Sequence, residues 1–197
     1  PVKEGDRLLP AVGPSPTDKR LASDRTAMPV FLLLVKANLE GIASISVKEN
    51  NVWCIDANDG TGGPVREAIT VDPNDELELE GSRGTANFII RWDKKSKSQS
   101  YINVIRHPDV RDMTADDSGQ WVPMLALECR GIEPVNWRPT TDLSCVSVGG
   151  TTFDGPPDGD RPGPEFSPGE MDWAGFDEEA GEAMAIMGLE WEWRPAP

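Results

Sequence analysis

The segment GSRGTAN at residues 81–87 leads directly into FIIRW at residues 88–92. Two glycines bracket an arginine, and the side chains that follow alternate in polarity, which predicts a tight turn and then a half-buried strand. The polar residues 93–98 come next, and a second apolar run occupies residues 101–105. Strand, polar tip and strand in this order predict a β-hairpin.

Short runs of strand-like composition also precede this hairpin. Turn-forming residues separate them, and the whole chain has 19 Gly and 18 Pro. The candidate strands are residues 31–39, 52–56 and 68–71 and the alternating Leu77 and Leu79. This spacing predicts a mainly β fold, an antiparallel sandwich or barrel-like sheet with little helix, in a single domain over residues 28–197.

The two halves of this domain resemble each other weakly. When Gly41-Ile42 is aligned with Gly131-Ile132, the alternating apolar residues before each glycine coincide. A tandem duplication would give two pseudo-symmetric halves, residues 28–106 and 120–197, each covering the exposed face of the other. Chance similarity over so few positions is the alternative.

Two proline-rich segments lie outside this pattern. Residues 1–27 lack apolar periodicity and contain three prolines between positions 10 and 16, which predicts an extended arm. Residues 153–170 contain DGPPDGDRPGPE, which cannot sustain a strand ladder because proline lacks the N–H donor, so a long surface loop is expected there. We expect the arm and the loop to contact other protein subunits.

The C-terminal residues continue the β pattern. Residues 176–180 are compatible with one short helical turn. The apolar residues from Met184 to Trp193 predict either a pair of terminal strands or one bulged strand, with Gly188 marking the break.

The net charge of −15 is concentrated in the second half, where residues 107–197 carry −14. Such a surface repels phosphate groups, so nucleic acid and an anionic membrane surface are not expected as partners. A solvated acidic face and a surface for a basic protein are the two remaining interpretations. Because no apolar run approaches the roughly 20 residues that a membrane helix needs, no membrane span is expected.

Three cysteines, Cys54, Cys129 and Cys145, stand far apart and cannot all pair in disulfides. This number favours small, buried, free thiols over a disulfide scaffold. It indicates a reducing intracellular compartment, with cytoplasm and mitochondrion both compatible.

Three motifs resemble the eukaryotic CXXC-motif-containing zinc-binding protein family. They are GSRGTAN at residues 81–87, ECRGIEP at residues 128–134, and DW and FD at residues 172–173 and 176–177. The resemblance runs in order from about Met28 to Arg194. It implies a small, mostly antiparallel β protein whose zinc is held by two CxxC pairs on facing hairpin tips.

At the four positions that the resemblance assigns to the zinc ligands, this chain has no cysteine. The first pair falls on Asp59 and Gly62, and the second on Trp92 and Lys95. Structural zinc sites are built from thiolate and imidazole groups, so we expect a degenerate member without a metal site and without a cofactor. We expect an Asp59–Lys95 ion pair and packing of the Trp92 indole to fasten the two tips instead.

No catalytic constellation is visible, and we expect no catalytic residue. The only histidine, His107, has no neighbouring serine or cysteine motif that would make it a base. Residues 81–84 lack the lysine and the helix of a phosphate-binding loop.

Three arginines, Arg83, Arg130 and Arg138, are of interest. Arg130 belongs either to an ion-pair network with nearby glutamates or, with Arg83, to the wall of a cavity for an anionic ligand. Together with Trp173, Arg83 and Arg130 are the expected contacts to a ligand or partner. The sequence therefore predicts a non-catalytic accessory subunit of a larger assembly, and a zinc-binding or metal-handling adaptor is the alternative.

Overall fold

The computed structural model describes residues 28–48, 50–93 and 98–197. The predicted arm, residues 1–27, and the tip residue Lys95 lie outside the described residues. Within them the chain is mostly strand, and the helical structure is the single 3-10 turn η1 (Ala115–Asp117). This confirms the predicted mainly β class with little helix. No helical segment of the described residues is long or apolar enough to cross a membrane.

The described residues contain fifteen strands. In chain order they are β1 (Val30–Glu40), β2 (Ile42–Val47), β3 (Trp53–Asn58), β4 (Arg66–Val71), β5 (Leu77–Glu78), β6 (Thr85–Ala86), β7 (Phe88–Ile90), β8 (Ser100–Ile105), β9 (Met113–Thr114), β10 (Val122–Arg130), β11 (Glu133–Trp137), β12 (Leu143–Ser147), β13 (Thr152–Phe153), β14 (Trp173–Asp177) and β15 (Glu182–Pro195).

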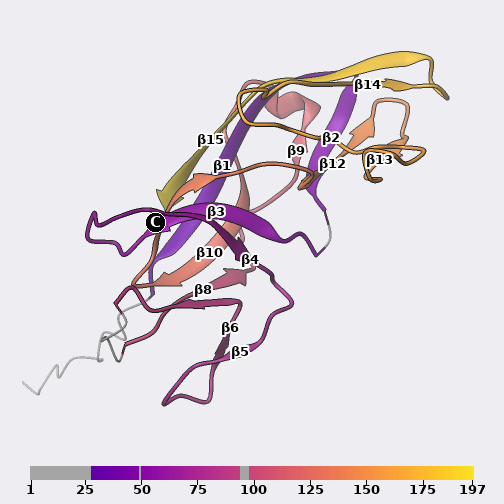
Figure 1. Ribbon diagram of the computed structural model, residues 1–197. Coiled ribbons are helices and arrows are strands. Elements are labelled where there is room, and N and C mark those ends of the chain that lie inside the picture. The colour runs from indigo at the N-terminus through magenta and orange to yellow at the C-terminus, as the bar shows by residue number, and fades with distance from the viewer. Residues whose placement is uncertain (1–27, 49, 94–97) are drawn as a thin grey trace, which may run out of the picture.

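A six-stranded antiparallel sheet in the order β14-β15-β1-β10-β8-β7 is the largest unit. Its long strands twist and curl along the length of the molecule (Figure 1). The central pair is β1 and β10, with Leu33 opposite Leu125. Alternation along β1 places Leu33 in the main core and Leu32 and Leu34 in a smaller core on the other face of the sheet.

The strand pairing repeats between the two halves. β1, β2 and β3 correspond to β10, β11 and β12, and the second strand of each half pairs with the third strand of the other, β2 with β12 and β11 with β3. In the large sheet, the hairpin β14–β15 flanks β1 just as the hairpin β7–β8 flanks β10. Each half thus completes the sheets of the other, in agreement with the predicted pseudo-symmetric arrangement.

The two aligned glycines occupy equivalent turns. Gly41 and Gly131 have φ angles of 64° and 63°, a region that side chains rarely adopt. A Cβ on Gly41 would lie 2.2 Å from the Ala183 carbonyl oxygen at the start of β15, and one on Gly131 would lie 2.6 Å from Ser100 Oγ at the start of β8. Glycine is therefore required by both the turn and the close approach of the corresponding strand.

The hairpin predicted from residues 88–105 is present as β7 and β8. At the C-terminus the bulged-strand alternative is confirmed, because β15 is one strand with a register shift where Gly188 and Leu189 face Ala37. The predicted helical turn at residues 176–180 is wrong. Phe176 lies in β14 and pairs with Ala183 of β15. A tight turn at residues 178–181 connects the two strands.

Candidate functional site

The first candidate position is the tip between β3 and β4, where Asp59 stands. Its Oδ1 accepts hydrogen bonds from the Thr61 N–H at 2.9 Å, the Thr61 hydroxyl at 2.7 Å and the Gly63 N–H at 3.3 Å. The Thr61 hydroxyl is the main cause of a lowered Asp59 pKa. The carboxylate therefore serves its own turn, in which Gly62 has a φ angle of 79°.

The second position is the start of the β7–β8 tip, where Trp92 stands. Its indole N–H donates to the Gly131 carbonyl oxygen at 2.8 Å, and its half-buried ring packs against the main core. Gly131 lies in the turn before β11, and Glu133 of β11 pairs with Asn58 at the end of β3. Trp92 thus connects the β7–β8 tip to the strand beside the β3–β4 tip.

These side chains do not fit a zinc ion. Asp59 is engaged within its own turn, Gly62 has no side chain, and the Trp92 nitrogen is used as a donor. In residues 28–48, 50–93 and 98–197, no three His, Cys, Asp or Glu side chains come together in a group that could hold a metal. The predicted Asp59–Lys95 ion pair lies outside the described residues and stays a prediction.

In the second half, the tips β12–β13 and β14–β15 correspond to the tips β3–β4 and β7–β8 of the first. Hydrogen bonds to one carboxylate join them. Asp177 is fully buried, and its Oδ2 accepts from the Ser147 hydroxyl at 2.5 Å. Its Oδ1 accepts from the N–H groups of Glu179 and Ala180 at 3.0 and 3.2 Å. Ser147 Oγ in turn accepts from the Thr151 N–H at 3.0 Å. One carboxylate therefore joins the two turns, and the Ser147 hydroxyl is the main cause of its lowered pKa.

A second buried carboxylate, Asp56 on β3, organises the neighbouring strands. It accepts from Arg138 Nε at 2.6 Å, Asn136 Nδ2 at 3.1 Å and the Ala68 N–H at 2.8 Å. Burial alone would raise its pKa, but the hydrogen bonds from Arg138, Ala68 and Asn136 together lower it. Ala68 has an unusual φ angle of 51°, and its hydrogen bond to Asp56 holds it there.

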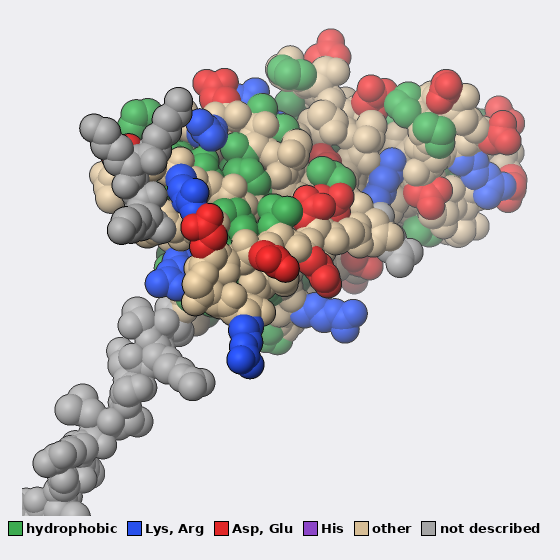
Figure 2. All heavy atoms as spheres, turned by 60° about the horizontal axis from the view of Figure 1, so that its bottom comes forward, with side chains coloured by type: hydrophobic (Ala, Val, Ile, Leu, Met, Phe, Trp, Pro, Cys, Tyr) green, Lys and Arg blue, Asp and Glu red, His purple; other side chains and the backbone are tan. Residues whose placement is uncertain are grey.

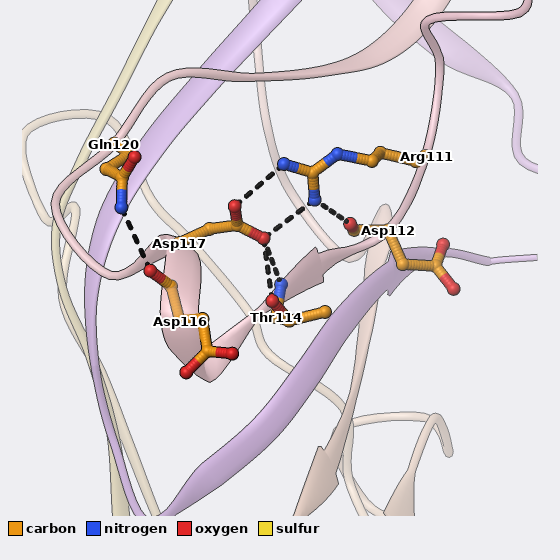
Figure 3. Close-up of polar contacts among 6 residues, drawn as sticks. All are labelled: Arg111, Asp112, Thr114, Asp116, Asp117 and Gln120. Atoms are coloured by element: carbon orange, nitrogen blue, oxygen red, sulfur yellow. Dashed lines mark hydrogen bonds and ion pairs between the residues drawn. The ribbon is translucent and has the colours of Figure 1, made fainter.

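A third acidic cluster is structural. Asp117 receives two hydrogen bonds from the Arg111 guanidinium, both at 2.7 Å, and two from Thr114 that cap η1 (Figure 3). Arg111 is the main cause of the lowered Asp117 pKa. The Gln120 amide donates to the Asp116 carbonyl oxygen and closes the turn. Both carboxylate oxygens of Asp117 are thus used in holding η1 to Arg111 and Thr114.

The predicted contact residues belong to three different elements. Arg83 is exposed in the turn between β5 and β6, and Arg130 is exposed at the end of β10. Among the described residues, neither arginine forms an ion pair, so the network expected around Arg130 is not formed there. Trp173 begins β14 and packs its half-buried ring against the main core. Whether any of these three contacts a partner stays a prediction.

The structure also shows the surroundings of His107, of the loop 153–170 and of the three cysteines. His107 is half-buried and accepts from the Asp109 N–H at 3.3 Å. The loop 153–170 is irregular, but its Phe166 is buried and donates its N–H to the Thr140 carbonyl oxygen, so the loop is anchored at that point. All three cysteines are free, with Cys129 and Cys145 buried and Cys54 partly exposed.

Sequence reasoning missed Asp56 and Asp177, the two carboxylates on which these contacts depend. The signal for Asp56 was an acidic residue within the apolar run of β3. Asp177 belongs to the FD motif at residues 176–177, but two exposed glutamates follow it, and nothing in the sequence indicated that it is buried.

The comparisons with known proteins agree with this architecture. Residues 32–194 match the family described as CXXC motif containing zinc binding protein, eukaryotic. The protein of that name from Xenopus laevis is 29% identical over 168 residues, which cover 83% of this chain and 96% of the relative. The one from Homo sapiens is 26% identical over 162 residues, which cover 81% and 94%.

Two solved structures share the fold. A structure titled as a hypothetical protein from Plasmodium falciparum superposes with a TM-score of 0.73 at 24% identity, over 85% of this chain and 100% of its own. The structure titled C1orf123 superposes with a TM-score of 0.70 at 23% identity, over 85% and 99%.

The sequence match and the shared fold cover nearly all of the described strands. The chain therefore belongs to the eukaryotic CXXC motif containing zinc binding protein family.

Proposed function

We propose that this chain is a non-catalytic accessory protein that binds other proteins, built on a zinc-binding-family scaffold whose metal site has been lost. The observation that carries the proposal is the engagement of the former ligand positions. The Asp59 carboxylate is satisfied within its own turn, and the Trp92 indole links the neighbouring tip to Gly131. Contacts of the chain itself thus replace the cross-link that a metal would supply.

The proposed contact surfaces are the arm, residues 1–27, and the loop 153–170. Within the loop, residues 156–161 are exposed, whereas Phe166 is buried and holds the segment in place. An anchored loop presents its exposed part without a large ordering cost on binding. The charge of residues 107–197 favours a partner with a basic face. On the face shown in Figure 2, acidic and basic side chains are interspersed with apolar ones.

The alternative function is that of a zinc-binding or metal-handling adaptor. Its support is the printed name of the relatives, which are called zinc binding proteins. For this chain it would require ligands other than Asp59, Gly62, Trp92 and Lys95. A compartment with reducing conditions suits both functions, because all three thiols are free.

Metal content separates the two functions. The native chain, purified without chelators, is expected to contain less than about 0.1 zinc per chain by elemental analysis and to keep its melting temperature in chelator. The matched positive control is the quadruple variant with Asp59→Cys, Gly62→Cys, Trp92→Cys and Lys95→Cys, which is expected to bind one zinc. Stoichiometric zinc that stays with the native chain through gel filtration would overturn the proposal.

Association is tested separately. The full chain, tagged at its C-terminus and recovered from its native source, is expected to co-purify with defined protein partners in stoichiometric amounts. Removal of residues 1–27, or replacement of residues 156–161 by a Gly-Ser linker of the same length, is expected to reduce that recovery. Recovery of the chain alone as a monomer would contradict the accessory role.

A further inference from the structure

A cavity of about 430 Å³ opens where β8 ends beside β10. Its volume lies within the range of about 300–1,000 Å³ that is typical of small-molecule sites. Buried residues 124–126 of β10 form its floor. Around this floor stand apolar side chains that are only partly buried and therefore present surface to a ligand, namely Val47, Pro73, Val104, Ile105 and Val110.

The second half of the molecule shows why this space is open. Strand β15 pairs with β1 as β8 pairs with β10, but β15 continues to Pro195, whereas β8 ends at Ile105. The additional length of β15 carries Trp191 and Trp193, whose half-buried rings pack against the main core. Strand β8 has no such extension, so the first half lacks these two indoles.

Arg106 stands at the position that corresponds to Trp191. Ile105 of β8 and Glu190 of β15 hold corresponding places in the two ladders, so the residues that follow them correspond as well. Arg106 lines the cavity and is exposed. An arginine at the rim of the first half thus takes the place of a ring that covers the core in the second.

Val47 stands at the position that corresponds to Trp137. Each is the last residue of its strand, β2 or β11. The next residue donates its N–H in an equivalent way, Lys48 to the chain entering β12 and Arg138 to β3, both at 2.9 Å. In the second half, the rings of Trp137 and Trp191 pack edge to face with centroids 5.7 Å apart. A valine and an arginine at these two positions leave room for a ring of indole size.

The charged residues that line this cavity are all basic. Among the described residues, Lys48, Arg106 and His107 line it and no Asp or Glu does, although the chain carries a net charge of −15. The Lys48 ammonium lies beside Gly163 of the loop 153–170. The Nδ1 atom of His107 is occupied, since it accepts from the Asp109 N–H at 3.3 Å and lies 3.8 Å from the Asp109 carboxylate.

The Arg106 guanidinium remains available. It forms no ion pair within residues 28–48, 50–93 and 98–197. A guanidinium presents several N–H donors in one plane and binds a carboxylate through two parallel hydrogen bonds. An arginine at the edge of an apolar cavity therefore favours a ligand with an apolar body and one carboxylate.

We propose that this cavity, the Arg106 cavity, binds a small aromatic carboxylate whose ring is about the size of an indole. The ring takes the space that Trp137 and Trp191 fill in the second half, in contact with the partly buried apolar side chains. The carboxylate accepts hydrogen bonds from the Arg106 guanidinium. This site lies apart from the positions that the resemblance assigns to zinc, and it does not rest on the proposed accessory function.

Two ligands of the same shape test the role of the carboxylate. Indole-3-propionate is negatively charged, and indole-3-propionamide is neutral. Titrated into the full native chain and followed by calorimetry and ligand-observed NMR, the propionate is expected to bind about tenfold more tightly, as a charge-assisted hydrogen bond at a partly exposed site gives. Added salt is expected to weaken binding of the propionate and to leave binding of the amide unchanged.

The variant Arg106→Gln locates the carboxylate. It removes the charge and is expected to bring the propionate down to the affinity of the amide, while the amide binds as before. The matched control is Arg66→Gln, which removes the same charge from an exposed position of β4 that does not line the cavity. This control is expected to bind both ligands as the native chain does.

The variant Val47→Trp locates the ring. It places in the first half the indole that the second half has at Trp137, and it is expected to fill the cavity and abolish binding of both ligands. The matched control is Val135→Trp, at an exposed position of β11 that does not line the cavity. It is expected to leave both affinities unchanged.

Several outcomes would overturn the proposal. Absence of saturable propionate binding to the native chain would show that the cavity is no site for this class of ligand. Equal affinities for the two ligands, or an unchanged propionate affinity in Arg106→Gln, would show that Arg106 does not bind the carboxylate. Unchanged binding in folded Val47→Trp would place the ring elsewhere. Because Arg106 is exposed, Arg106→Gln is expected to fold, and its result decides even if Val47→Trp does not.

Discussion

The tips β3–β4 and β7–β8 of the first half are topologically equivalent to the tips β12–β13 and β14–β15 of the second, yet they are fastened differently. In the second half, buried Asp177 joins both turns through Ser147. In the first half, the partners of Asp59 among the described residues lie in its own turn, and Trp92 donates to Gly131. The same pair of hairpins can therefore be held by one shared carboxylate or by separate local contacts.

The largest expected effect is that of Asp177→Ala. The substitution leaves the Ser147 hydroxyl and the N–H groups of Glu179 and Ala180 without their acceptor in a buried position. Loss of these bonds is expected to lower the melting temperature by about 8 °C, measured by calorimetry. Glu178→Ala, an exposed neighbour in the same turn, is the control and is expected to change it by less than about 1 °C.

The same measurement on Asp59→Ala tests the comparison directly. Because the partners of Asp59 among the described residues all lie in its own exposed turn, its removal is expected to lower the melting temperature by less than a third of the Asp177→Ala effect. Equal shifts for the two variants would mean that Asp59 also fastens the facing tip, and the contrast between the halves would be wrong.

Trp92→Ala is expected to have the next largest effect. It removes a half-buried indole from the core and its hydrogen bond to Gly131, and should cost about 2 kcal/mol of unfolding free energy, measured by urea denaturation. Lys95→Ala is expected to cost less than about 0.5 kcal/mol. Equal costs would contradict the assignment of the main contact to Trp92.

The strands and turns of this fold were largely predictable, because they depend on local pattern. Alternating apolar residues gave β1, β3 and β8, and Gly41 and Gly131 marked the two equivalent turns. Gly188 was correctly placed at the break, although the sequence left open whether one bulged strand or two strands follow the loop. Strand β12 was missed, because Asp142 and two serines interrupt its apolar pattern. In the structure these residues are buried, with Ser144 bonded to Ser46 of β2 and Asp142 accepting from Asn51 in the connection between β2 and β3.

The candidate site was less predictable, because its important groups work through long-range contacts. The residue types at the positions that the resemblance assigns to zinc could be read from the sequence, but the Trp92–Gly131 bond joins residues 39 positions apart. Asp177 and Ser147 are 30 positions apart. Nothing in a single sequence identifies which of many acidic residues is buried with such a partner.

The contacts of Asp177 in the second half are expected to be sensitive to acid. The pKa of Asp177 is lowered in the folded chain, mainly by the Ser147 hydroxyl. Its stabilising contribution is therefore present above the ordinary aspartate pKa of about 4 and is lost as the pH falls through the lower folded value. Asp177→Asn is expected to flatten the loss of stability as the pH falls below about 4, measured by urea denaturation at each pH.

The control for this effect is Glu178→Gln, which alters an exposed carboxyl in the same turn. It is expected to leave the acid limb of the stability profile as steep as in the native chain. An Asp177→Asn variant with an unchanged acid limb would show that the other carboxyls with a lowered pKa, Asp56, Asp59 and Asp117, account for the acid-induced loss of stability.

The last prediction concerns the reactivity of the thiols on the equivalent strands β3 and β12, and it involves no change in stability. Burial raises the pKa of Cys145 on β12 to about 12, and that of Cys129 likewise, so neither forms a reactive thiolate at pH 8. Cys54 on β3 is partly exposed, and although burial raises its pKa, the Arg138 guanidinium opposes that rise.

A disulfide reagent at pH 8 is therefore expected to titrate one thiol in the folded chain and three in denaturant. Cys54→Ser should abolish the reaction of the folded chain. A thiol that still reacts in this variant would mean that the second half opens as readily as the first.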